Sequence, residues 1–170
     1  MAIAQDAIFL LTGPEAKRSK IFGTGFAVAH KDGQLYLLTC AHVVEQLEGK
    51  VRVGEQEAEV EAIGSGDSID LALLRIPCAE PPLLLHHIVQ GRVDMKFEIC
   101  GYGPFSGAKG NYVLRDIAGR LGKSIAFESP GNDRVEAWDL HVEDDEFSRL
   151  QGGYSGLPLC DEDGFPFPEP

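Results

Sequence analysis

The chain has 170 residues, of which 44% are hydrophobic and 25% are charged, as in a globular protein that buries a core in one domain or two small lobes. Its 15 lysines and arginines against 27 aspartates and glutamates give a net charge of −12. Phosphate groups repel such an acidic chain, which argues against nucleic acid and anionic membranes as partners. The 20 glycines and 10 prolines indicate many turns and favour an all-β chain over a helical bundle.

The first residues lack the features of a targeting segment. They contain no basic stretch, Asp6 interrupts them, and the apolar run from Ala7 to Leu11 is too short for a signal peptide. No stretch approaches the ~20 apolar residues that cross a membrane. These features predict a cytoplasmic protein.

Short segments rich in β-forming residues fill the first part of the chain. Gln34–Cys40 follows the turn Lys31-Asp32-Gly33, which is a hairpin signal. Glu57–Ile63 alternates between apolar and charged residues, and Leu71–Ile76 is a nearly continuous apolar run. Six strands are predicted before residue 77: Ala7–Leu11, Ile21–Ala29, Gln34–Cys40, Val51–Val53, Glu57–Ile63 and Leu71–Ile76.

A proline-rich stretch over residues 77–82 predicts a linker between two lobes, residues 1–76 and 83–170. In the second lobe, Leu121-Gly122 suits a tight hairpin between two strands. The tail 165–170 has prolines at alternate positions and cannot form a central strand. At most a helical turn is expected after His42. Five strands are predicted in the second lobe: Phe97–Tyr102, Tyr112–Arg120, Lys123–Glu128, Val135–His141 and Leu157–Cys160.

Three segments carry residues of catalytic type. They are Leu38-Thr39-Cys40-Ala41-His42, the stretch Ser68-Ile69-Asp70 that opens an apolar strand, and Gly152-Gly153-Tyr154-Ser155-Gly156-Leu157-Pro158. In this order of His, Asp and Ser they resemble the trypsin-like (chymotrypsin-fold) serine peptidases of the bacterial intracellular type. The segment Gly23-Thr24-Gly25-Phe26 resembles an early strand of the same family. The resemblance covers about residues 5–160 and implies an all-β fold of two antiparallel β-barrel lobes.

Other families that use a serine, a histidine and an acid fail on the order of these residues. An α/β-hydrolase needs a histidine after the serine, and no histidine follows Ser155. A subtilisin needs the aspartate before the histidine on a scaffold with many helices, which this chain lacks.

The resemblance implies a role for each residue. A serine hydroxyl is a weak nucleophile at neutral pH and needs an adjacent base. His42 would take the proton of Ser155 and later give it to the leaving amine, while Asp70 would accept the other ring N–H of His42. The backbone N–H groups of Gly153 and Ser155 would form the oxyanion hole. The reaction is then acyl transfer to Ser155 followed by hydrolysis, without a metal or a cofactor.

Less specific interpretations of these residues stay open. Asp67 competes with Asp70 for the third role, although Asp67 lies in a Gly-Asp-Ser sequence typical of a turn. A serine between glycines is often only a turn residue. The pair His86-His87 is expected at the surface. The four cysteines, which include no CxxC pair, are predicted to be small buried hydrophobic residues and not ligands or disulfides.

The chain also departs from the pattern of the family. Tyr154 stands where many secreted members have the aspartate that binds a newly cleaved N-terminus, so activation of that kind is not expected. Arg149 falls where the family has the floor of the specificity pocket. A basic floor would favour an acidic residue before the scissile bond, unless this loop differs in length and Arg149 is exposed. The short stretch after Ser155 leads to the hypothesis that the second lobe is incomplete at its C-terminus, as in part of a longer protein.

The sequence therefore predicts a serine endopeptidase that acts on a protein or peptide and has a fused or separate regulatory domain. The alternative is a peptide-binding module of the same fold, with weak catalysis, that holds peptides by strand addition. A third interpretation is an esterase that uses the same serine.

Overall fold

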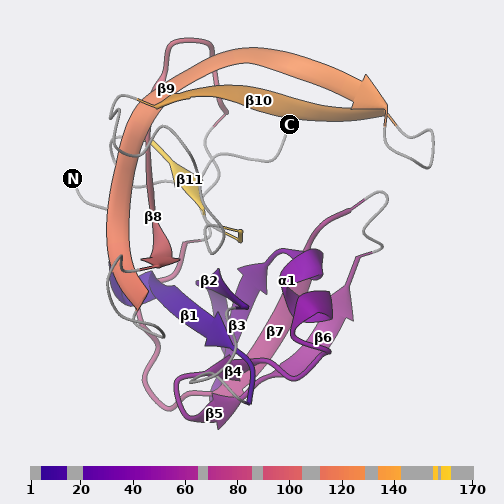
Figure 1. Cartoon of the computed structure of the whole chain (residues 1–170). Helices are drawn as coiled ribbons and strands as arrows, with labels where there is room; N and C mark the ends of the chain where they lie inside the picture. Colours follow the sequence, from indigo (N-terminus) through magenta and orange to yellow (C-terminus); the bar gives the residue numbers. More distant parts are fainter. Residues whose placement is uncertain are drawn as a thin grey trace.

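The computed structural model describes residues 5–14, 21–64, 69–85, 90–104, 112–128, 134–142, 155–156 and 158–161. Within these ranges the protein is mostly β, as the sequence predicts, and has two antiparallel sheets, a 3₁₀ turn η1 (Gln5–Ala7) and one short helix, α1 (Ala41–Gln46) (Figure 1). The described residues include no helix long and apolar enough to span a membrane. The first sheet contains β1 (Ile8–Thr12), β2 (Phe22–Lys31), β3 (Gln34–Thr39), β4 (Arg52–Val53), β5 (Gln56–Glu57), β6 (Glu59–Ile63) and β7 (Ala72–Pro77). The second sheet contains β8 (Lys96–Pro104), β9 (Tyr112–Glu128), β10 (Arg134–Val142) and β11 (Leu159–Cys160).

The first sheet is a nearly closed barrel. Its strand order is β5-β4-β1-β2-β3-β7-β6, and the two end strands, β5 and β6, are consecutive in the chain. Ala58 lies between them, and its N–H donates to the carbonyl of Val51 at 2.8 Å. Closure in this way leaves few unpaired strand edges on this sheet.

The hairpin predicted at Lys31-Asp32-Gly33 is confirmed. Asp32 and Gly33 have φ values of 52° and 72°, and Lys31 pairs with Gln34 across the turn. Two successive positive φ values give the turn that matches the twist of an antiparallel pair. Helix α1 follows β3 with only Cys40 between them and contains His42, where the sequence predicts at most a helical turn.

The predicted hairpin at Leu121-Gly122 is wrong, because β9 continues through it from Tyr112 to Glu128. The backbone N–H of Leu121 donates to Met95 at 2.9 Å, and its carbonyl accepts from Asp94 at 2.8 Å. Gly122 permits close approach of β10, since a Cβ there would lie 2.8 Å from Nε2 of His141 and 3.1 Å from the carbonyl oxygen of Asp139. A Cβ at Gly119 would lie 2.3 Å from the carbonyl oxygen of His141 and 2.6 Å from the Phe97 ring.

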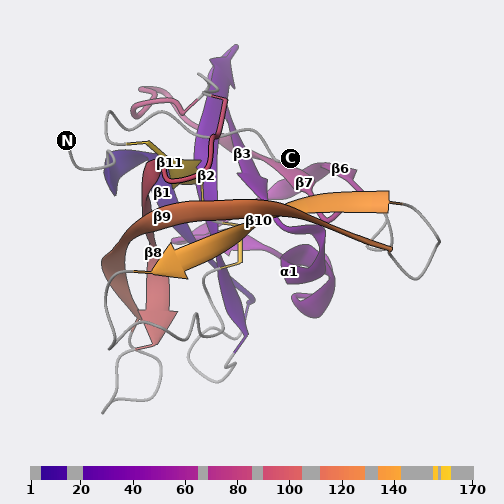
Figure 2. The ribbon, with the colours of Figure 1, turned by 90° about the horizontal axis from the view of Figure 1, so that it is seen from above.

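Strand β9 is long enough to pair with different neighbours along its length. Its first half pairs with β8 and its second half with β10, in the order β10-β9-β8-β11. The β9–β10 pair forms a long curved ribbon that crosses over the first sheet (Figures 1 and 2). The last strand, β11, has two residues and pairs with β8. The second lobe is thus a four-stranded sheet in the described part of the chain.

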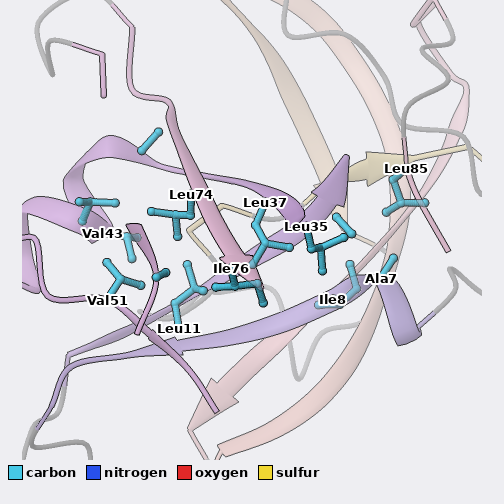
Figure 3. Packing of buried hydrophobic residues seen from close by; sticks show 14 of the residues in the cluster. Ala7, Ile8, Leu11, Leu35, Leu37, Val43, Val51, Leu74, Ile76 and Leu85 are labelled. Carbon is cyan, nitrogen blue, oxygen red and sulfur yellow. The ribbon is translucent and has the colours of Figure 1, made fainter. Parts of the chain in front are cut away.

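The main hydrophobic core lies inside the first sheet (Figure 3). Its most buried large side chains include Leu11, Leu37 and Leu74, and burial of each leucine contributes about 1.5–3 kcal/mol. Cys100 and Cys160 of the second sheet join this core, so the two sheets share it. A smaller core forms within the second sheet around four buried residues, Phe97, Ile99, Ile117 and Leu121.

The prediction of buried cysteines is confirmed for Cys100 and Cys160, whereas Cys40 and Cys78 are half-buried. Burial raises the pKa of Cys160 to about 12, with a further contribution from Asp161. Burial, followed by Asp116, raises the pKa of Cys100 as well. Both therefore remain neutral thiols at physiological pH and behave as small apolar side chains.

We predict that Gly119→Ala lowers the free energy of unfolding by about 1–3 kcal/mol, because the added methyl group meets backbone and a packed ring. Urea unfolding can be followed through the fluorescence of Trp138, which packs against the smaller core. Lys123→Ala, on the exposed face of β9, is the control and should change the free energy by less than about 0.5 kcal/mol. Equal stability of the two variants would contradict the assigned role of Gly119.

Candidate active site

His42 and Asp70 form a pair held by two hydrogen bonds. The ring Nδ1 of His42 lies 2.6 Å from Oδ2 of Asp70, and the backbone N–H of His42 donates to Oδ1 at 2.9 Å. A carboxylate only accepts, so in the neutral ring this contact favours the tautomer with its proton on Nδ1 and its lone pair on Nε2. The side chains are 40% and 44% exposed, respectively, so the ring is accessible from solvent.

The register between β3 and β7 brings these two residues together. Thr39, the last residue of β3, pairs with Ala72, the first residue of β7. His42 lies at the start of α1, shortly after Thr39, and Asp70 lies just before β7, with only Leu71 between them. Because the strands run antiparallel, the end of one and the start of the other lie at the same edge.

The turn that carries Ser155 is bonded to the same part of the first sheet. The backbone N–H of Thr24 in β2 donates to the carbonyl of Ser155 at 3.0 Å. The next residue, Gly156, has a φ of +85°, and a Cβ there would lie 2.1 Å from the Thr24 carbonyl oxygen and 2.5 Å from Oγ1 of Thr39. Only glycine combines this backbone conformation with this close approach. The turn is therefore seated on β2 and on the end of β3 that leads to His42.

Sequence reasoning missed the two threonines that organise this region. Thr24 and Thr39 are both completely buried. Oγ1 of Thr39 donates to the Thr24 carbonyl at 2.8 Å, and Oγ1 of Thr24 accepts from the backbone N–H of Tyr102 in β8 at 3.1 Å. Both residues lie in segments that carry the family resemblance. Their signal was a polar residue within an otherwise apolar strand.

The structure thus pairs His42 with Asp70 and seats the Ser155 turn beside the strand end that leads to them. Among the described residues there is no hydrogen bond between the Ser155 hydroxyl and the His42 ring. Such contacts are often long in a protein without substrate and shorten when it binds.

Several sequence predictions fall on residues outside the described ranges. These include the second oxyanion donor Gly153, the candidate pocket residue Arg149, and Asp67, the competitor of Asp70. Their roles stay predictions, and so do the boundaries of the two lobes.

Among the residues that the structure describes, one cluster of side chains has ligand atoms close enough to hold a metal ion. Cys40, His42 and Asp70 each offer a ligand atom, and these atoms lie within 4.8 Å of one another. The sequence predicts Cys40 as a small buried hydrophobic residue and does not place it near Asp70.

No protein-family model and no curated protein matches the sequence. Solved structures do match. The Rv3671c protease from M. tuberculosis in its active form is 20% identical with a TM-score of 0.63, over 96% of this chain and 68% of that one. The serine endoprotease from Yersinia pestis is 16% identical with a TM-score of 0.61, over 96% of this chain and 52% of that one. Deg5 is 19% identical with a TM-score of 0.59, over 95% of this chain and 77% of that one.

The chain has the trypsin-like fold. This confirms the predicted fold class, with a nearly closed seven-stranded barrel and a second sheet of four strands. At these levels of identity the likeness concerns the fold, and any activity has to be argued from the residues of this chain.

We predict that Thr39→Val lowers the free energy of unfolding by about 1–3 kcal/mol, because it removes the buried hydroxyl that bonds the Thr24 carbonyl at nearly constant volume. Thr12→Val, which changes another buried threonine of the first sheet, is the matched control. Denaturation of both variants in urea measures the difference. If Thr39→Val is no less stable than the control, the hydrogen bond between Thr39 and Thr24 does not stabilise the site.

Proposed function

We propose that this protein is a serine endopeptidase in which Ser155 is the nucleophile, His42 the general base and Asp70 the residue that orients His42. The observation that carries the proposal is the double hydrogen bond from His42 to Asp70. One bond fixes the carboxylate against the backbone, and the other fixes the ring tautomer that leaves Nε2 able to accept a proton. The likeness in fold to proteins described as a protease and a serine endoprotease supports the same activity.

In this mechanism the hydroxyl of Ser155 attacks the peptide carbonyl while Nε2 of His42 takes its proton. The imidazolium that forms is stabilised by Asp70 through the 2.6 Å contact with Nδ1. The proton passes to the leaving amine, and an acyl group remains on Ser155. Water, activated by His42 in the same way, then hydrolyses this ester.

The oxyanion of the intermediate would be stabilised by the backbone N–H groups of Gly153 and Ser155. Support for this comes from Gly156 and the Thr24 contact, which seat the Ser155 backbone on the first sheet. Loss of one such donor typically raises the barrier by about 2.7–4 kcal/mol.

Three wider predictions from the sequence stay part of the proposal. They are a cytoplasmic location, a place in a larger regulated protein, and a preference for an acidic residue before the scissile bond through Arg149. The location of the native gene product tests the first, and its mass tests the second. Cleavage of a peptide library tests the third, and a preference for Lys or Arg would exclude it.

We predict that a fluorophosphonate probe labels the wild-type protein and that Ser155→Ala abolishes the labelling, since no other serine has an activating base in this proposal. Ser124→Ala, at an exposed position on β9, is the control and should retain full labelling. Labelling is read by in-gel fluorescence and by mass spectrometry of the modified peptide. Absence of labelling in the folded wild-type protein would favour the peptide-binding module over the enzyme.

We predict that Asp70→Asn lowers the rate of probe labelling by about 10⁴-fold, because an amide can donate to Nδ1 and so place the ring proton on Nε2. The chain contains a matched control. His141 and Asp139 form another histidine–aspartate pair, with 3.0 Å between Nε2 and Oδ2, and both side chains are exposed on β10. Asp139→Asn should leave the rate unchanged. Equal rates for the two variants would remove Asp70 from the mechanism.

A further inference from the structure

The candidate active site also contains the three most common types of zinc ligand. Cys40 directly precedes α1, and its backbone is extended, with φ −75° and ψ 143°. Its side chain does not cap the helix. The ligand atoms of Cys40, His42 and Asp70 lie within 4.8 Å of one another. A thiolate, an imidazole and a carboxylate are the donors that Zn²⁺ takes in proteins.

The geometry suits a zinc ion with three protein ligands and one water. Ligand distances of about 2.0–2.3 Å place tetrahedral ligand atoms roughly 3.5 Å apart, so the three side chains need only a small movement. The half-exposed His42 and the exposed Asp70 leave an open side for the ion to enter and for a water to occupy the fourth position. A thiolate and a carboxylate also neutralise the two charges of the ion.

The two oxygens of Asp70 suit different tasks in such a site. Oδ1 accepts the backbone N–H of His42 at 2.9 Å, and this bond can persist when a metal binds. Oδ2 faces Nδ1 of His42 at 2.6 Å, so it lies beside the nitrogen that would become a ligand. A ligating carboxylate that is also held by a hydrogen bond is typical of protein metal sites.

We propose that Cys40, His42 and Asp70 form an inhibitory zinc site within the candidate active site. Zinc binds the Sγ of Cys40, Nδ1 of His42 and Oδ2 of Asp70. The thiol releases one proton to solvent. The imidazole stays neutral, since its proton moves from Nδ1 to Nε2 when the Nδ1 lone pair binds the ion. Nε2 then carries a hydrogen and cannot accept the proton of Ser155. The inhibition rests on the proposed peptidase function, whereas the binding of metal does not.

Binding is tested with Co²⁺, which takes the same ligands as zinc and gives a near-ultraviolet charge-transfer band when a thiolate binds it. The wild-type protein should show this band, and Zn²⁺ should remove it by displacement. Cys40→Ser should lack the band. Cys78→Ala, which changes the other half-buried cysteine, should keep it. A wild-type protein without the band, or a Cys40→Ser variant that retains it, would overturn the site.

Two further variants keep this test decisive if Cys40→Ser is unstable. His42→Ala and Asp70→Ala change side chains that are 40% and 44% exposed, so the fold should tolerate both. Each should weaken cobalt binding by at least about 10-fold, since even the loss of a residue that only supports a ligand weakens metal sites by roughly 10–100-fold. Unchanged affinity in both variants would also overturn the site.

Inhibition is tested separately with the fluorophosphonate probe. Zinc should lower the labelling rate of the wild-type protein, and a chelator should restore it. Cys40→Ser, normalised to its own rate without metal, should need at least about 10-fold more zinc for the same inhibition. Labelling that zinc does not affect, in a protein that binds cobalt through Cys40, would refute inhibition alone. Absence of labelling without metal would refute the peptidase proposal and leave the cobalt result intact.

Discussion

Three hydrogen bonds of Thr24 join the parts of this molecule that the candidate site needs. Its N–H binds the carbonyl of Ser155, its carbonyl accepts from Thr39, and its hydroxyl accepts from the N–H of Tyr102 in the second sheet. Thr24 and Thr39 are completely buried, so any shift that breaks these bonds leaves polar groups unsatisfied away from water. One residue of β2 thus ties the turn that carries Ser155, the strand that leads to His42 and the second sheet to a common position.

The relative positions of His42, Asp70 and Ser155 follow from these hydrogen bonds together with the strand register. The pairing of Thr39 with Ala72 sets the distance between the start of α1 and the start of β7, and with it the contact from His42 to Asp70. Thr39 also bonds Thr24, which holds Ser155. His42 and Ser155 are therefore both positioned by the same end of β3, although they are far apart in the chain. A site built on rigid strands in this way needs little reorganisation when a substrate binds.

The sequence predicts those features that depend on local pattern. Alternation and turn residues place most strands and the hairpin at Asp32-Gly33, and the order of His42, Asp70 and Ser155 indicates the fold. The error at Leu121-Gly122 has a physical cause: glycine marks both a turn and a close contact, and only the partners of β9 distinguish them. A polar residue within an apolar strand marks Thr24 as unusual, but its partners, like those of Cys40, are distant in sequence and no local pattern identifies them.

In the candidate site, the groups that would react are exposed, whereas the groups that stabilise the fold are buried. Thr24 and Thr39 are buried and bonded within the fold, whereas His42 and Asp70 are 40% and 44% exposed, and a solvated pair of this kind contributes little to folding. Substitutions of the exposed pair should therefore change reactivity or metal binding without unfolding the protein. Substitutions of the threonines act through the scaffold and should change stability together with the position of Ser155. This difference lets a measured loss of function be assigned to the reacting groups or to the framework that holds them.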